Sequence, residues 1–520
     1  MTSLDKLITR FLSFASVLVI AISGTVAFAD VSVPKLFSDH MVLQRDKPLK
    51  IWGWADAGEA VSVSMAGKSA QAEADADGKW MVTLPSLPAG GPHVVTIEGK
   101  NSLRLDDVLI GEVWIASGQS NMQWALNNSL NVDLAKLTVN RQPQIRFNQV
   151  WNMGSQTPQD DVTDPWKVAT PDSIGYFSAV AYAFAETLHA TLGVPVGIIQ
   201  NAWGGSNAET WVDRKVIIND PALSNIHEEW LNIEATFDLQ AEMARYEEQL
   251  VEWEVKVAEA KAEDQDPPHK PRKPHDRMTA QHRPGNLWNG RVLPIAPISI
   301  RGAIWYQGEG NSQSIGRAMQ YEHLFSTMIS EWRKLWGEDF SFYWAQLADF
   351  KKESAFGEDE TWAYLRNSQT GTMALPNTGQ AVIIDIGEGY DIHPRQKEEV
   401  GRRLARWALN KDYGYSDLAH RSPELDSWKQ NGSNLVLKFN YTGKGLRPFD
   451  TRSVHGFAIK DEAGHWHTVE GKVRGKDTVI IDLGNDLPVT AIAYAWADNP
   501  ICNLFSYEGL PVNPFRTDVE

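Results

Sequence analysis

The stretch Val113-Trp-Ile-Ala-Ser-Gly-Gln-Ser-Asn-Met122 decides the fold of this chain. An apolar run at 113–116 ends at a Ser-Gly-Gln turn, which leads Ser120 into what reads as the start of a helix. At the carboxyl end of a parallel strand, a hydroxyl faces the crevice where α/β sheets bind ligands, and the N–H groups of the next helix can stabilise an oxyanion. Ser120 is therefore a candidate nucleophile, although serine at such a turn is also a common helix N-cap.

Strands and helices alternate on both sides of this stretch. The apolar runs expected as strands are 113–116, 196–200, 302–306, 341–347 and 380–385, and the expected helices are 178–192, 321–336, 360–374 and 394–409. Near-continuous apolar runs that alternate with helices predict a doubly wound parallel sheet. We assign this α/β domain to residues 107–410.

The flanks and one internal segment have a different pattern. Short β-like runs between turn residues predict an N-terminal β-sandwich at 30–106, and β signals return in a C-terminal β-rich region at 411–520. Residues from about 216 to 286 begin with a charge-rich helical stretch and continue through a Pro- and Lys-rich run at 267–274. This pattern predicts a helical hairpin inserted at the rim of the sheet.

Composition restricts the compartment and the partners. The first 29 residues resemble a secretory signal peptide, with basic Lys6 and Arg10, an apolar core and an Ala-Phe-Ala cleavage site that ends at Ala29. We therefore expect a secreted or periplasmic protein, and no later stretch is long and apolar enough to span a membrane. A net charge of -17 disfavours nucleic acid and anionic membranes as partners. Cys502 is the only cysteine, and the histidines lack metal-ligand spacing, so no metal site is expected. The serine chemistry considered below requires no cofactor.

A base for Ser120 is offered by Asp385-Ile-Gly-Glu-Gly-Tyr-Asp391-Ile-His393-Pro394. This segment leaves a predicted strand, so His393 should lie at the same edge of the sheet as Ser120. The acid that would orient the imidazole stays open. Asp391 is the first choice because it is closest in sequence, Asp385 is the second and Glu388 the third, and a Ser-His dyad with a backbone carbonyl as orienter is the remaining alternative.

Two of these motifs resemble those of a known family. Gly118-Gln-Ser-Asn-Met122 and Asp391-Ile-His-Pro394 resemble blocks I and V of the SGNH hydrolases, in the form found in the sialate O-acetylesterase family. The resemblance implies a three-layer α/β/α domain with a parallel sheet, flanked by sandwich-like β regions. The broader family pattern Asp-x-x-His would place the acid at Tyr390, so the chain departs from it there.

Two further strand ends resemble the oxyanion blocks of that family. Asn201-Ala-Trp-Gly-Gly-Ser206 resembles block II, which implies that the N–H groups of Ser120 and Gly205 are oxyanion donors. Trp305-Tyr-Gln-Gly-Glu-Gly-Asn311 resembles block III, in which Gln307 replaces an asparagine donor and Asn311 is the alternative. The candidate substrate contacts flank these turns and are Gln119, Asn121, Trp203 and Glu309, with Glu309 also a candidate acceptor that orients its own loop.

The resemblance implies an exported esterase that removes O-acetyl groups from carbohydrates through an acetyl-serine intermediate. The family name points to acetylated sialic acid, and acetylated plant-wall glycans such as xylan or xyloglucan are the alternative substrates. A non-catalytic glycan-binding protein on the same scaffold is the rival from another functional class.

Overall fold

The computed structural model describes residues 30–519, so the predicted signal peptide at 1–29 lies outside the described residues. Its centre is a sheet with the strand order β14-β12-β11-β7-β10-β8-β9, parallel except for β9, which pairs antiparallel with β8. The strands are β7 (Ser102–Gly118), β8 (Ile145–Gln149), β9 (Trp166–Val168), β10 (Val196–Ala202), β11 (Gly302–Tyr306), β12 (Ser341–Ala345) and β14 (Thr378–Ala381).

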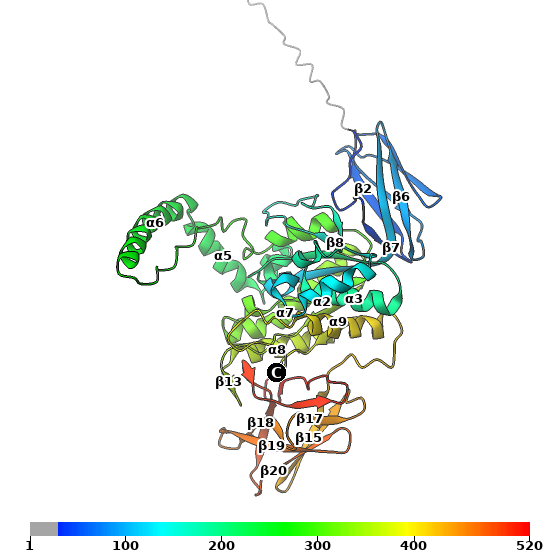
Figure 1. The fold of residues 1–520 in the computed structure, drawn as a ribbon. Coiled ribbons are helices and arrows are strands. Elements are labelled where there is room, and N and C mark those ends of the chain that lie inside the picture. Colours follow the sequence, from blue (N-terminus) through cyan, green and yellow to red (C-terminus); the bar gives the residue numbers. More distant parts are fainter. Residues whose placement is uncertain (1–29, 520) are drawn as a thin grey trace, which may run out of the picture.

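Helices cover both faces of this sheet, which makes a three-layer α/β/α domain (Figure 1). On one face lie α3 (Ala179–Leu192) and α9 (Lys397–Lys411), and on the other lie α7 (Ile315–Trp336) and α8 (Thr361–Gly371). Local chemistry sets the bounds of α3, because the Ser178 side chain accepts from the N–H of Ala181 at its start and Gly193 adopts a left-handed φ of 66° at its end. The predicted fold class is confirmed.

The strand β7 is longer than the predicted strand and continues beyond the central sheet. It also pairs with β1 (Val42–Gln44) and β6 (Gly90–Glu98), and β6 pairs in turn with β3 (Ala60–Met65) and β3 with β4 (Lys68–Glu73). A second small sheet of β2 (Leu49–Trp54) and β5 (Lys79–Leu84) completes the N-terminal β region. The predicted domain boundary at residue 106 thus falls inside one continuous strand, and the division into domains stays a prediction.

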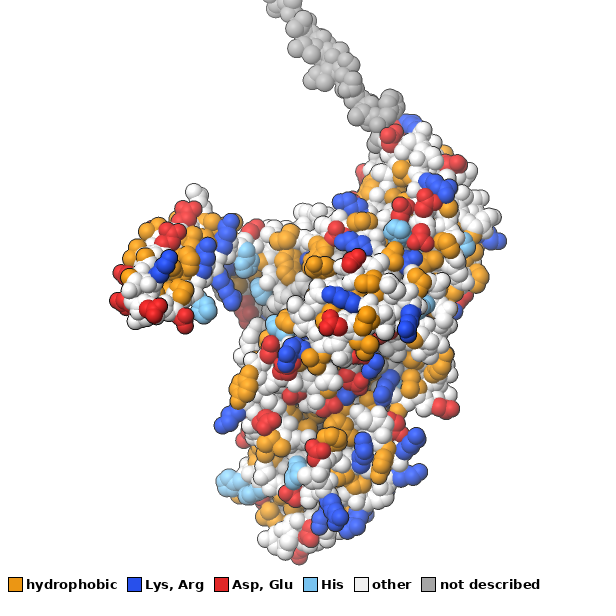
Figure 2. Space-filling view, in the orientation of Figure 1, with side chains coloured by type: hydrophobic (Ala, Val, Ile, Leu, Met, Phe, Trp, Pro, Cys, Tyr) orange, Lys and Arg blue, Asp and Glu red, His pale blue; other side chains and the backbone are white. Residues whose placement is uncertain are grey.

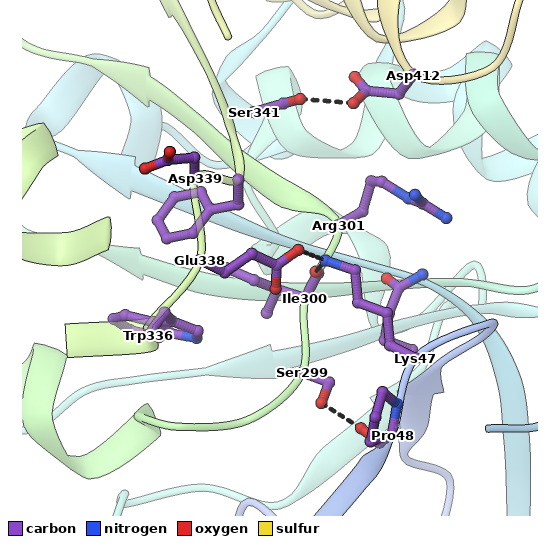
Figure 3. A network of polar contacts seen from close by, with 12 residues as sticks. Lys47, Pro48, Ser299, Ile300, Arg301, Trp336, Glu338, Asp339, Ser341 and Asp412 are labelled. Carbon is purple, nitrogen blue, oxygen red and sulfur yellow. Dashed lines mark hydrogen bonds and ion pairs between the residues drawn. The ribbon is translucent and has the colours of Figure 1, made fainter. Parts of the chain in front are cut away.

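Polar contacts join the N-terminal β region to the central domain (Figure 3). Lys47 donates to the Ile300 carbonyl at 2.7 Å and pairs with Glu338, and the Ser299 hydroxyl donates to the Pro48 carbonyl at 2.6 Å. The buried Glu112 of β7 pairs with the guanidinium groups of Arg45 and Arg301, which are sequence neighbours of Lys47 and Ile300. The two regions therefore share hydrogen bonds and ion pairs as well as a strand.

The C-terminal β region forms a seven-stranded antiparallel sheet, with the order β15-β16-β20-β19-β18-β21-β24, beneath the central domain in Figure 1. Its strands are β15 (Glu424–Asn431), β16 (Asn434–Asn440), β18 (Val454–Asp461), β19 (Trp466–Arg474), β20 (Thr478–Asp482), β21 (Val489–Tyr494) and β24 (Phe515–Arg516). Two further two-stranded sheets are short. In one, β13 (Glu353–Ser354) pairs with β22 (Asn499–Pro500), and in the other, β17 (Leu446–Pro448) pairs with β23 (Leu504–Ser506).

The predicted insertion forms α5 (Ser224–Thr236) and α6 (Leu239–Ala262), which extend as an arm away from the central domain (Figure 1). Figure 2 shows acidic, basic and hydrophobic side chains mixed over the arm and the rest of the drawn face. None of the helices within residues 30–519 combines the length and apolar character that a membrane span needs.

One predicted helix begins later than expected, and this changes the setting of His393. The expected helix at 394–409 starts at Lys397, and β14 ends at Ala381 rather than at Asp385. Val382 and Ile384 instead pack into the core of the C-terminal β region, which draws the chain away from the sheet. His393 therefore lies in a loop of residues 382–396 and not beside the first turn of a helix.

Candidate active site

Ser120 is held at the carboxyl edge of the sheet by a tight connection between β7 and α1 (Ser120–Gln123). Gly118 has a φ of 130°, and a Cβ there would lie 2.2 Å from the carbonyl oxygen of Tyr306, so only glycine fits. The next residue, Gln119, donates its backbone N–H to the same carbonyl at 3.0 Å. This hydrogen bond holds the turn against the end of β11. Ser120 therefore lies at the edge of the sheet where β10 and β11 also end.

His393 reaches this serine from the loop after β14. Its Nε2 atom lies 2.8 Å from the Ser120 hydroxyl oxygen, which is hydrogen-bonding distance. The indole of Trp124 stacks on the imidazole with ring centroids 4.6 Å apart and an interplanar angle of 11°. Burial, and after it the nearby Lys397 ammonium, hold the pKa of His393 below its usual value, and the Asp391 carboxylate acts in the opposite direction. A neutral imidazole is the form that can accept a proton from serine.

The three carboxylates considered as the orienting acid have different partners. Asp391 accepts the backbone N–H of His393 at 2.9 Å, but its Oδ1 atom is 3.8 Å from the imidazole Nδ1, too far for a hydrogen bond. Asp385 is turned to Arg403, which donates to both of its oxygens at 2.7 and 2.8 Å. Glu388 accepts from the backbone N–H and the guanidinium of Arg395. Within the described residues, no acceptor or donor lies at hydrogen-bonding distance from the imidazole Nδ1.

Two backbone N–H groups near Ser120 are free to receive an oxyanion. The N–H of Ser120 is the first of α1 and so has no acceptor within the helix. Gly205, with a φ of 74°, follows β10, and no acceptor for its N–H lies in the described part of the chain. The neighbouring Gly204 N–H is already bonded to the Gln123 side chain at 2.8 Å. Of the two glycines, Gly205 therefore has the unbonded N–H, and its role as an oxyanion donor stays a prediction.

A serine, a histidine at hydrogen-bonding distance from it and two free N–H groups at one strand edge are the parts that acyl transfer requires, and comparisons with known proteins agree. No protein-family model matches the chain. Sialate O-acetylesterase of Mus musculus is 28% identical over 92% of this chain and 93% of its own length, and that of Homo sapiens is 25% identical over 92% and 91%. A carbohydrate acetylesterase from Xanthomonas citri, known from its crystal structure, is 35% identical with a TM-score of 0.78 over 94% of this chain and 100% of that one. This chain belongs to the family of that carbohydrate acetylesterase, and it is similar to the curated sialate O-acetylesterases. It is a carboxylic ester hydrolase with the SGNH-type fold.

The block III side chains of this esterase are engaged inside the protein. The Gln307 amide donates to the Ser206 carbonyl at 3.1 Å and to the Asn311 side chain at 2.7 Å, and it accepts from Tyr321 at 2.8 Å. Because both amide protons of the buried Gln307 are used, the predicted donation to an oxyanion does not fit this geometry. Asn311 is also buried and donates to Glu209 at 2.8 Å. Both residues support the loop and are not placed to touch a substrate.

The four expected substrate contacts divide into two kinds. Gln119 is buried, and its side-chain oxygen accepts from the N–H groups of Gly308 and Gly310, so it is a loop support. Asn121 is also buried, and its side chain bonds other protein groups, so the predicted contact with substrate does not fit this position. Trp203 and Glu309 are half-buried, and only Trp203 presents an aromatic face of the kind that stacks on sugars. The Arg291 guanidinium lies over the Trp203 ring, 4.5 Å from the ring centroid.

Sequence reasoning missed several residues around Ser120. Trp124 lies one helical turn after the serine, and Lys397 lies four residues after His393, so spacing was a usable signal for both. Gln281 and His282 come from the return segment of the insertion, and a Cβ on Gly205 would lie 3.6 and 3.9 Å from their side chains. No sequence pattern connects the insertion to this turn. In residues 30–519, no group of His, Cys, Asp and Glu is arranged to hold a metal ion.

Proposed function

We propose that this esterase is a secreted enzyme that removes O-acetyl groups from carbohydrates through an acetyl-serine intermediate. Ser120 attacks the acetyl carbonyl carbon while His393 takes the hydroxyl proton, and the N–H groups of Ser120 and Gly205 stabilise the oxyanion. The tetrahedral intermediate collapses with loss of the sugar oxygen, which receives the proton from His393. Water then attacks the acetyl-serine with His393 as base, releasing acetate and restoring the serine.

The observation that carries this proposal is the 2.8 Å contact between His393 Nε2 and the Ser120 hydroxyl. It joins the nucleophile and its base at the strand edge where Gly205 offers an unbonded N–H. The nearest carboxylate, Asp391, is the proposed acid, acting through its charge at 3.8 Å rather than through a hydrogen bond to the imidazole.

The test is acetate release by the parent and by Ser120→Ala and His393→Ala. Each substitution should lower turnover by about 10⁴ or more, because nucleophile and base act as a unit. Ser129→Ala is the matched control, since within residues 30–519 the hydroxyl of this serine donates to the Ala125 carbonyl alone. Mass spectrometry of the rapidly quenched parent should find an acetyl group on the Ser120 peptide. Full activity in Ser120→Ala would refute the mechanism.

We propose an acetylated sialic acid as the substrate, because the curated relatives are named sialate O-acetylesterases. The Xanthomonas citri relative is named only a carbohydrate acetylesterase, so acetylated xylan and xyloglucan stay as alternatives. Acetate release from a panel of acetylated sialosides, xylan and xyloglucan oligosaccharides ranks them. Hydrolysis of p-nitrophenyl acetate separates any enzyme from a glycan-binding protein.

Secretion is proposed from residues 1–29 of the sequence. Sequencing of the exported protein should find Asp30 as its first residue. An uncleaved amino terminus would contradict this assignment.

A further inference from the structure

The side chain of Asn121, the residue after the nucleophile, connects three segments of the site. Its amide nitrogen donates to the Glu309 carboxylate at 2.5 Å and to the Ile392 carbonyl at 3.0 Å, and its oxygen accepts from the Lys397 ammonium. These three contacts use the whole hydrogen-bonding capacity of the buried amide except one lone pair. Asn121 therefore ties the serine turn to the backbone carbonyl that directly precedes His393.

Two opposite charges lie at the ends of this connection. Lys397 is only 1% exposed, and its ammonium lies over the Tyr306 ring, 5.3 Å from the centroid. Glu309 has one oxygen bonded to Asn121, and its other oxygen is buried without a partner in the described structure. A buried charge without a counter-charge is costly, so each of these ions needs the other. The Asn121 amide is oriented to link them, with its oxygen toward the cation and its nitrogen toward the anion.

From this arrangement we infer that Lys397, Asn121 and Glu309 form a buried bridge that holds Ser120 and His393 at hydrogen-bonding distance. Lys397 is then a positioning residue, and its charge also sets the proton affinity of His393. The inference rests on the proposed roles of Ser120 and His393.

The need for such a bridge follows from the setting of the base. No hydrogen bond to Nδ1 within the described residues fixes the imidazole, and the loop that carries it is not part of a helix or strand. Its backbone is instead held through Ile392 by Asn121. Since misplacement of catalytic groups by about 1 Å can cost a hundredfold in rate, a support of this loop has a large effect on turnover.

The charges that face the two titrating groups determine the sign of the pH effect. Toward His393 they are Lys397 and Asp391, and toward Lys397 they are Glu309, Asp391 and Glu388. Burial lowers the pKa of Lys397 to about 7, against the attraction of Glu309, and burial raises the pKa of Glu309. A positive charge at Lys397 favours the neutral form of His393. Its removal should therefore raise the pKa of the base and move the acid limb of kcat/KM to higher pH.

The experiment compares pH–rate profiles of Lys397→Met, Glu309→Gln and the double variant with the parent. Lys397→Met should lower kcat about a hundredfold with KM nearly unchanged, and should move the acid limb upward by about half a pH unit or more. Glu309→Gln keeps an oxygen acceptor for Asn121, so the loss of kcat should be smaller. Because it removes the carboxylate that raises the pKa of Lys397, Lys397 should lose its charge more readily, which shifts the limb in the same direction. Lys411→Met, at the exposed end of the same helix, is the matched control and should resemble the parent.

The double variant guards against a failure to fold, because it leaves no buried charge unpaired. If the folded double variant keeps the kcat and the acid limb of the parent, Lys397 and Glu309 are structural only and the inference is overturned. Ser120→Ala measured alongside keeps the two proposals apart. Loss of activity in that variant with no effect of the double variant would refute the bridge alone, and retained activity would refute the proposed mechanism itself.

Discussion

The role of Asp391 can be measured with one substitution, Asp391→Asn. The asparagine oxygen can still accept the backbone N–H of His393, as the carboxylate does at 2.9 Å, so the loop should keep its shape. Only the negative charge 3.8 Å from the imidazole is lost. Two unit charges at 3.8 Å attract by about 1 kcal/mol in water and about 4 kcal/mol at the effective dielectric constant of a protein surface.

The exposure of Asp391 to solvent determines which of these two interaction energies applies. The Asp391 side chain is 52% exposed, so its charge is well screened, and the lower end of the range applies. A loss of about 1.4 kcal/mol of imidazolium stabilisation corresponds to a tenfold fall in kcat/KM. An acid that is hydrogen-bonded to the imidazole would instead cost about 10⁴.

The assay is kcat/KM for an acetyl ester near neutral pH, with the folded state checked by circular dichroism. A loss of three to four orders of magnitude would show that Asp391 bonds Nδ1 during the reaction and would refute the reasoning from distance and exposure. In Asp385→Asn, by contrast, the expected damage is to stability, because Arg403 loses its two-oxygen partner.

Three further substitutions test other parts of the structure. Glu112→Gln should lower the free energy of unfolding by about 3 kcal/mol in denaturant titrations, because it leaves Arg45 and Arg301 without their buried partner. Although burial opposes it, Arg301 and then Arg45 hold the pKa of Glu112 below its usual value of 4.5. This stabilisation is therefore complete above pH 4.5 and is lost as the pH falls through the pKa of the folded state, and the variant should lack that acid-dependent loss. Trp124→Leu should lower kcat about tenfold, since the indole face that supports the imidazolium is removed, and an unchanged kcat would exclude a role for the stack. Gly205→Ala places a methyl group at a residue with a φ of 74°, where there is room beside Gln281, so the protein should fold with about 1 kcal/mol of backbone strain. Because the strain should displace the Gly205 N–H, kcat should fall about tenfold, and an unchanged kcat would exclude this N–H as an oxyanion donor.

The sequence was sufficient to predict the layers of the fold and the meeting of Ser120 with His393. Both follow from one rule, because all parallel strands of a sheet present their carboxyl ends at one edge, and each residue follows such an end. The longer β7 was missed because its first part alternates exposed and buried residues whereas its second part is buried on both faces. These are two different strand patterns within one strand.

Side-chain partners that come from other elements could not be predicted in the same way. Asp385 is directed away from His393 by Arg403, which lies on the following helix, and no pattern in the loop itself signals that pairing. Gln307 has the amide expected of an oxyanion donor, but it donates both amide protons inside the protein, to Ser206 and Asn311. A buried Lys397 is equally hidden from composition, since lysine is ordinarily a surface residue.

The continuity of strand β7 also has a consequence for how this enzyme unfolds. Its residues Leu109 to Gly111 pair with β1, and the next residues, from Glu112 to Gly118, pair with β10. A chain that began at residue 107 would keep the second set of bonds and would expose the first as an unpaired strand edge, which is a template for aggregation. Unfolding of the N-terminal region should therefore spread along this strand to Ser120 itself, so that amide protons near residues 42 and 116 exchange with solvent in one cooperative event.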